Sequence, residues 1–230
     1  MRRLIAIASA ATALITVTAG AQGAGAVRLQ LAPGSQLTFE GTSTLHGFTC
    51  TTKTMQAYID VDPSYRTADL STMAHPIVAV QVVIPVKSLA CGGELENNMF
   101  KTLNASKFPY IVYKLSSYDI ISGSASATGF TTATKGQLTI SGKENPIAMS
   151  VKASRGADGV VSAIGDEEIK MTQFGIKPPT FMLGTLRVRD ELKIHFNIKA
   201  TSAAVASAMA ELNARLAMTT FDATVAAPRR

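Results

Sequence analysis

The sequence predicts an all-β protein, built either as an antiparallel sandwich or as a closed barrel. From about residue 27 to residue 200, apolar and polar side chains alternate with a period of two, and Gly and Pro punctuate the alternation. Several such stretches follow one another with little helix between them, which is typical of these two architectures. Of the 230 residues, 47% are hydrophobic and 17% are charged, so the chain has the composition of a protein with a sizeable core.

Alternation also locates the individual strands. In 191–200, Leu192, Ile194 and Phe196 alternate with charged and polar residues, which indicates one face in the core and one face in water. The other predicted strands, in chain order, cover residues 37–45, 56–62, 77–86, 111–116, 136–141, 147–153 and 160–171. No internal repeat and no long linker interrupts this series, so residues 27–200 are predicted to form one domain.

Two segments have helical spacing instead. Leu95, Met99 and Leu103 recur every four residues, which predicts one short amphipathic helix between residues 93 and 104. In the tail, residues 201–230, the same kind of spacing predicts an Ala-rich helix, carried by Val205, Met209, Leu212 and Leu216. Three roles for this helix stay open: packing on the barrel wall, contact in a homodimer or with an envelope protein, and lying on a membrane surface. A single arginine, Arg215, gives the helix little attraction to anionic lipid.

The first 21 residues have the pattern of a cleavable signal peptide. Arg2 and Arg3 are followed by an apolar stretch at 4–17 and by the small residues Ala19-Gly20-Ala21, and a second such triplet places an alternative cut after residue 26. An uncleaved membrane anchor is the alternative, and the shortness of the apolar stretch disfavours it. No later apolar run approaches the roughly 20 residues of a membrane helix. We expect an exported protein, periplasmic or secreted, without a membrane span.

The net charge of +6 does not predict a nucleic-acid partner. Arginines 2, 3, 229 and 230 lie near the chain ends, and without these four charges the net charge is +2. The remaining Lys and Arg residues are scattered singly and form no stripe that could follow a phosphate backbone.

Cys50 and Cys91 are the only cysteines, and in an oxidising compartment they are expected to pair. A zinc site of His46, Cys50, His75 and Cys91 is the alternative. It is disfavoured because His46 and Cys50 would lie about 13 Å apart along an unbroken strand, too far to share one metal ion. We therefore predict a disulfide and no metal.

Catalytic motifs are missing from the chain: it has no G-x-S-x-G elbow, P-loop, H-E-x-x-H or C-x-x-C. His46 is a candidate base for a serine nucleophile, but no neighbouring residues complete a triad. The acidic cluster at 166–168 is interpreted as a solvated turn rather than a general-acid pair. The residues therefore predict a protein that is not an enzyme.

A barrel of about eight strands either fills its interior with side chains or keeps a cavity for a small apolar ligand. Periodicity does not separate these two cases. Met99, Phe100 and Phe108 would suit an adaptable apolar mouth, and they would equally suit an ordinary core.

Several segments, in this order and at this spacing, resemble the YceI-like family of exported lipid-binding proteins. They are LTFEGTSTLHGF at 37–48, IPVKSL at 84–89, NNMFKTLNA at 97–105, FPYI at 108–111, GQLTISG at 136–142 and MTQFGI at 171–176. The resemblance covers about residues 27–200. It departs from the family at Met171 and Gln173, where many members carry Arg and an acid in R-x-D-F-G-I.

This resemblance implies an antiparallel, lipocalin-like barrel with a short inserted helix, which holds a polyisoprenoid chain in an apolar tunnel without catalysis, cofactor or metal. On this basis we expect a periplasmic carrier for a long amphiphile of the polyisoprenoid, isoprenoid quinone or fatty acyl type. The alternative is a non-catalytic envelope interaction protein whose barrel is filled by side chains. The candidate tunnel residues are Phe39, His46, Met99, Phe100, Phe108, Tyr113, Phe174 and Phe181, with His46 and Tyr113 near the head group.

Overall fold

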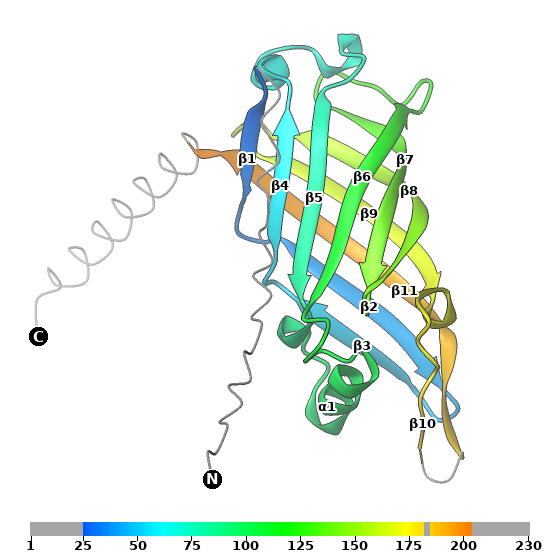
Figure 1. Cartoon of the computed structure of the whole chain (residues 1–230). Helices are drawn as coiled ribbons and strands as arrows, with labels where there is room; N and C mark the ends of the chain where they lie inside the picture. Colours follow the sequence, from blue (N-terminus) through cyan, green and yellow to red (C-terminus); the bar gives the residue numbers. More distant parts are fainter. Residues whose placement is uncertain (1–24, 182–184, 204–230) are drawn as a thin grey trace, which may run out of the picture.

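Eleven antiparallel strands in the computed structural model belong to one sheet. The structure describes residues 25–181 and 185–203. The strands are β1 (Val27–Leu31), β2 (Gln36–Ser43), β3 (Gly47–Thr52), β4 (Gln56–Val61), β5 (Ile77–Pro85), β6 (Tyr110–Ile120), β7 (Gly129–Ile140), β8 (Lys143–Arg155), β9 (Val161–Lys170), β10 (Thr180–Phe181) and β11 (Leu186–Ser202). Eight of them close into a barrel in the order β1-β4-β5-β6-β7-β8-β9-β11, because β11 pairs again with β1 (Figure 1).

The longest strand, β11, closes the barrel by pairing with two strands in succession along one edge. Its residues 188–197 pair with β2, and its last residues, 200–202, pair with β1. Ser35 fixes the connection between β1 and β2 to β11. Its hydroxyl donates a hydrogen bond to the carbonyl of Ala32 and accepts one from the N–H of Lys199. The third strand, β3, then lies outside β2 and is joined to Ala90 by a pair of backbone hydrogen bonds with Thr51.

Short helical segments cover the two ends of the barrel (Figure 1). One end carries the 3-10 turns η1 (Pro63–Arg66) and η2 (Leu70–Thr72). The opposite end carries the helix α1 (Gly93–Thr102) and the 3-10 turn η4 (Met171–Phe174). A disulfide between Cys50 on β3 and Cys91, just before α1, ties this helix to the wall, as predicted.

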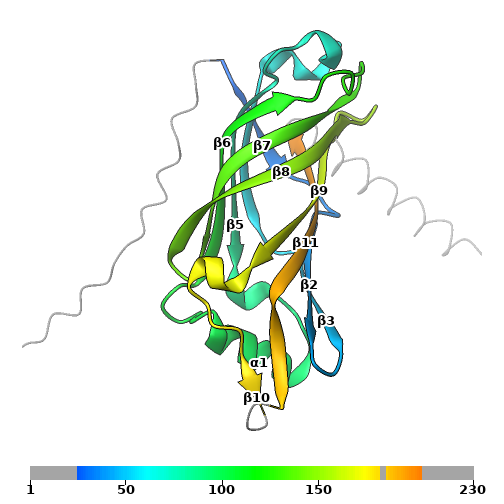
Figure 2. The same ribbon diagram turned by 90° about the vertical axis from the view of Figure 1, so that its right-hand side faces the viewer.

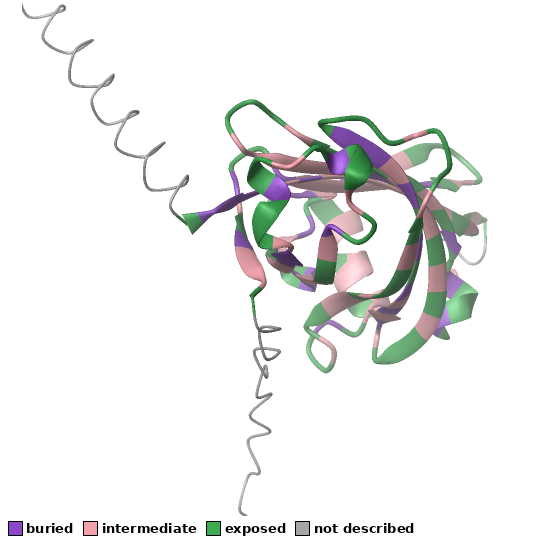
Figure 3. Ribbon diagram, turned by 90° about the horizontal axis from the view of Figure 1, so that it is seen from above, coloured by how far each residue is buried: buried purple, intermediate pink, exposed green. Residues whose placement is uncertain are grey.

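The core lies inside the ring of strands that Figure 3 shows along the barrel axis. One buried cluster at the η4 end combines Leu138, Ile140, Ile169, Met171, Phe174 and Ile176. Another, at the opposite end, packs Tyr65 of η1 against Leu29, Val61 and Ala200. Alternation supplies the strand residues of these clusters, because every second residue of each strand points inward. Residues of η1, of η4 and just after η4 complete them.

The predicted all-β barrel with one inserted helix is confirmed. The eight predicted strands correspond to β2, β4, β5, β6, β7, β8, β9 and β11, and the helix predicted at 93–104 is α1. Three short strands, β1, β3 and β10, have no counterpart in the prediction. The acidic residues 166–168 lie inside β9, so their interpretation as a turn is wrong. The signal peptide predicted at 1–21 and the helix predicted in 201–230 lie outside the described residues, except for residues 201–203.

The hairpin between β7 and β8 gives a sharp stability prediction. Ser141 and Gly142 both have positive φ, at 50° and 75°, as a two-residue turn of this kind requires. A methyl group at Gly142 would also overlap the ring of Phe108, which covers the turn. We expect Gly142→Ala to lower the free energy of unfolding by about 3 kcal/mol, from backbone strain and displacement of the ring together.

Urea denaturation of Gly142→Ala and Gly123→Ala separates the two causes. Gly123 has the same φ of 75°, but no atom lies within 4 Å of where its methyl group would be. Gly123→Ala should therefore cost about 1 kcal/mol from backbone strain alone. Equal losses in the two variants would show that the Phe108 ring does not restrain this turn.

Candidate binding cavity

The barrel encloses a cavity of about 310 Å³, so side chains do not fill its interior. Inward residues of the barrel strands and of β2 and β3 line it, and the atoms that face it are almost entirely apolar. Its volume lies at the lower end of the range typical of small-molecule sites, and its lining is typical of sites for apolar ligands.

Three inward glycines keep the middle of the barrel open. The ring of Tyr113 lies over Gly136, and the ring of Phe196 lies over Gly165; in each case a methyl group on the glycine would come within 2.5 Å of the ring. The ring of Phe48 lies over Gly41 in the same way. The three rings line the cavity while resting against the wall, where a glycine leaves room for them.

Three inward hydroxyl groups of the wall are engaged by the protein itself. Thr132 and Thr134 donate hydrogen bonds to the carbonyls of Val151 and Met149, at 3.2 and 3.0 Å. Burial raises the pKa of Tyr113 above its ordinary value, and a hydrogen bond with the Thr134 hydroxyl partly offsets this rise. These contacts explain how a wall with several threonines presents so apolar a surface.

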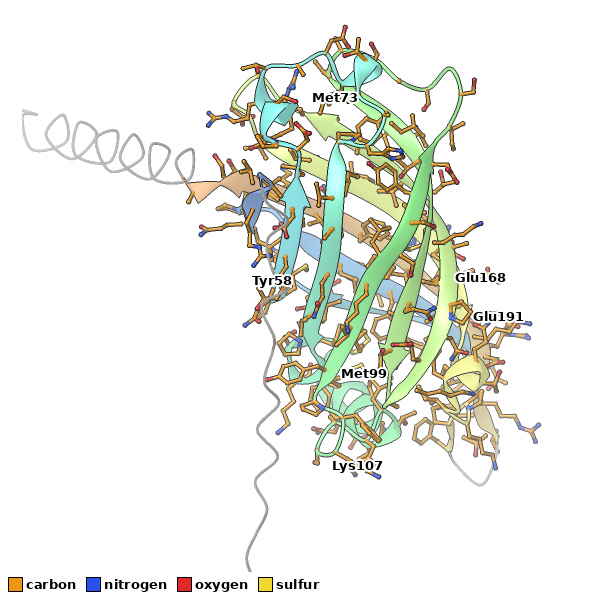
Figure 4. All side chains as sticks on the ribbon, turned by 45° about the horizontal axis from the view of Figure 1, so that its top comes forward. Tyr58, Met73, Met99, Lys107, Glu168 and Glu191 are labelled. Carbon is orange, nitrogen blue, oxygen red and sulfur yellow. A yellow bond between two sulfur atoms is a disulfide. The ribbon has the colours of Figure 1, made fainter. Side chains whose placement is uncertain are left out.

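Each end of the cavity has a distinct cover. At the η1 end, Tyr65 and Leu70 are buried against it, and the Arg155 guanidinium donates to the backbone carbonyls of Tyr65, Ala68 and Ala127. At the other end, α1 contributes Leu95, Met99 and Leu103. Figure 4 shows Met99 at this end of the barrel.

The structure brings five of the eight candidate residues together. Phe39, Met99, Tyr113, Phe174 and Phe181 all line the cavity. They come from β2, α1, β6, η4 and β10, and of these residues only Phe174 and Phe181 lie within ten positions of each other in the sequence. That they contact a lipid stays a prediction.

The other three candidates do not line the cavity. His46 is exposed in the turn between β2 and β3. Phe100 is half-buried on α1, where its neighbour Met99 takes the side facing the cavity, and Phe108 covers Gly142. The rings of Phe48 and Phe196 were not predicted, although each follows from a glycine inside a strand facing an aromatic residue on the next.

The described residues contain no group of three or more His, Cys, Asp or Glu side chains placed to hold a metal ion. Cys50 and Cys91 are both in the disulfide, so the zinc site considered as an alternative has no thiolate ligand. His195 pairs with Asp166 on the outer face of the barrel, away from the cavity. No helix within 25–181 and 185–203 is long and apolar enough to cross a membrane.

Comparison with known proteins agrees with this geometry. The family model of the YceI-like domain matches residues 31–200. The chain belongs to the YceI-like family. The two residues at which the sequence departs from the expected R-x-D-F-G-I segment are structural here: Met171 is buried in the core cluster, and the Gln173 side chain accepts the backbone N–H of Lys170 at 2.9 Å.

Two solved structures from bacteria have the same fold. Burkholderia cenocepacia BcnA has a TM-score of 0.57 and 20% identity, over 73% of this chain and 96% of that one. A polyisoprenoid binding domain from Saccharophagus degradans has a TM-score of 0.56 and 14% identity, over 77% of this chain and 99% of that one. No curated relative matches the chain. At these identities the structural relatives share the fold with this YceI-like protein.

Proposed function

We propose that the protein is a non-catalytic carrier that holds the chain of an amphiphilic lipid inside its barrel. The ligand class is a long polyisoprenoid, isoprenoid quinone or fatty acyl chain. The cavity of about 310 Å³ with its almost entirely apolar lining is the observation that carries this proposal. The description of the Saccharophagus degradans domain as polyisoprenoid binding supports the same ligand class for this chain.

Burial of the chain supplies the affinity in this proposal. Each CH₂ group removed from water contributes about 0.8 kcal/mol, so about ten buried carbons contribute about 8 kcal/mol, which corresponds to micromolar binding before the cost of ordering the chain. The alternative function, an envelope interaction protein with a filled barrel, loses its main support because the interior holds a cavity.

An exported, periplasmic or secreted location completes the proposal. The leader pattern at residues 1–21 supports it. The disulfide supports it independently, since such bonds persist in oxidising compartments and are rare in the cytosol. A carrier in an aqueous compartment between membranes would need the kind of enclosed apolar site that this barrel offers.

Native mass spectrometry of the exported protein, before and after organic extraction, tests the function. We expect a lipid to co-purify at one molecule per chain, and the stripped protein to take up geranylgeraniol again at the same ratio. The stripped chain should weigh two protons less than its reduced form, because of the disulfide. A protein that is empty as purified and takes up neither prenol, quinone nor fatty acyl chain would overturn the carrier function.

A further inference from the structure

The barrel wall opens between the start of β8 and the end of β9, and this opening is called the parting below. The two strands pair from Ser150–Asp166 to Arg155–Val161, but β8 begins at Lys143 and β9 continues to Lys170. Figure 2 shows the strands running side by side at one end and diverging toward the α1 end. A hydrogen bond of 2.6 Å from the Asn145 amide to the carbonyl of Gln173 closes the parting at its far end.

The sequence favours an unpaired margin of β8 at the far end of the parting. Pro146 lies exposed in the unpaired part of β8 and has no N–H to donate to a further strand, so this stretch has the character of an edge. Residues on both margins of the parting reach the cavity: Ile147 and Met149 from β8, and Glu167 and Ile169 from β9. The parting is therefore continuous with the cavity wall.

Glu167 is the first residue of β9 beyond the last pair with β8, and it lies on the inward face. Gly165 and Ile169, two residues to either side, are buried, whereas Asp166 and Glu168 are exposed. Glu167 is half-buried and lines the cavity. An acid at an inward position of an apolar barrel costs desolvation energy. Its presence there therefore indicates a role other than stabilising the fold.

No partner within the described chain accounts for Glu167, since its carboxylate makes no hydrogen bond or ion pair there. The residue opposite it on β11 is the apolar Ile194, and Met149 of β8 lines the cavity near it. Arg155, the other charged residue of the described lining, is occupied by three carbonyls. It also lies six residues of β9 away, about 20 Å.

We propose that the parting between β8 and β9 receives the head group of the bound lipid, and that Glu167 selects an uncharged head with a hydroxyl or amide hydrogen over a carboxylate. The assignment rests on the carrier function proposed above. An ionised Glu167 accepts a hydrogen bond from such a head and repels a carboxylate. A neutral Glu167 can still exchange hydrogen bonds with a hydroxyl or amide, so the preferred class is accommodated in both states.

The electrostatic surroundings fit this role. Burial raises the pKa of Glu167, and the like charge of Glu168 raises it further. Lys193 and His195, which flank Ile194 on β11, pair in register with Glu168 and Asp166 rather than with Glu167. A carboxylate head brought to this place would meet an acid without a compensating cation, a repulsion that strengthens in a low-dielectric setting.

Competition binding with three lipids of one chain length tests the selection. Delipidated protein is loaded with the uncharged fluorophore N-phenyl-1-naphthylamine at pH 8, and 1-hexadecanol, hexadecanamide and hexadecanoic acid displace it in turn. The variants are Glu167→Gln, which removes only the charge, and Glu168→Gln as the matched control. Glu168→Gln makes the same change one residue away. Glu168 is exposed on the outer surface, near Glu191 (Figure 4).

We expect the wild type and Glu168→Gln to prefer the alcohol and the amide to the acid by about tenfold or more, and Glu167→Gln to lose most of this preference as the acid gains affinity. Equal affinity of the wild type for alcohol and acid, or an unchanged ratio in Glu167→Gln, would overturn the assignment while the carrier function stands. Failure of all three lipids to displace the probe from any of the proteins would overturn the carrier function, and this assignment with it.

Discussion

Replacement of Ala163 by tryptophan should lower the affinity for a long-chain alcohol by about a hundredfold. Ala163 faces the cavity from near the start of β9, where it packs against the cluster of Met55, Ile84 and Ile198. An indole at this position would occupy space that the lipid chain needs. Exclusion of about four CH₂ groups at about 0.8 kcal/mol each costs about 3 kcal/mol, which corresponds to the hundredfold loss.

The neighbouring residue supplies the control. Ile164 lies on the outer face of the same strand and is 47% exposed, so Ile164→Trp adds the same ring without entering the cavity. Titration of stripped protein with 1-hexadecanol should give wild-type affinity for Ile164→Trp and a graded loss through Ala163→Leu to Ala163→Trp. Near-ultraviolet circular dichroism checks that each variant is folded. Wild-type affinity in folded Ala163→Trp would mean that the lipid does not occupy this part of the barrel.

Removal of the disulfide should lower the free energy of unfolding by about 4 kcal/mol. The bond joins residues 41 positions apart, and in the chain-entropy model closure of such a loop restricts the unfolded chain by this amount. Alanine at both cysteines avoids leaving a hydroxyl at Cys50, which is 1% exposed. Because the bond also ties α1 to β3, the same variant should release bound lipid faster.

Guanidinium denaturation and a stopped-flow displacement assay measure the two effects. Wild-type protein in reductant should reproduce the stability of Cys50→Ala/Cys91→Ala, since both lack the same bond. A loss of less than about 1 kcal/mol would show that contacts of Ala90 with Thr51 already hold this junction. Unchanged lipid release would show that α1 does not control the exit of the ligand.

Most of the fold could be predicted because nearly every long strand has one wet and one buried face, which imposes a period of two on the sequence. Strands without that contrast were missed. The third strand, β3, is GFTCTT, in which Thr residues blur the alternation, and β1 has only five residues. The closure of the barrel by β11 depends on pairing between residues more than 160 positions apart, as between Leu31 and Ala200, which no local pattern reports.

The cavity was less predictable, for two physical reasons. Met99 and Phe100 are adjacent on a short helix, and a helix turns by about 100° per residue, so only one of them faces the cavity. The apolar ring at Phe108 serves to cover Gly142 from outside the cavity. This contact joins residues 34 positions apart, which composition does not reveal. Glu167 was grouped with its acidic neighbours, and only its place in the strand separates it from them.

The pairs of glycine and aromatic ring determine how sequence changes can alter the width of the cavity. At Gly136 with Tyr113, and at Gly165 with Phe196, neither partner can change alone without either a steric overlap or a hole in the wall. A methyl group at Gly136 would also meet the backbone carbonyl of Lys114 at 2.6 Å, and one at Gly165 would meet that of Ser150 at 2.9 Å, so the glycine is needed whichever residue stands opposite it. Lineages that accommodate thicker or thinner chains would therefore be expected to keep both glycines and to differ at the ring positions, where a smaller side chain widens the cavity.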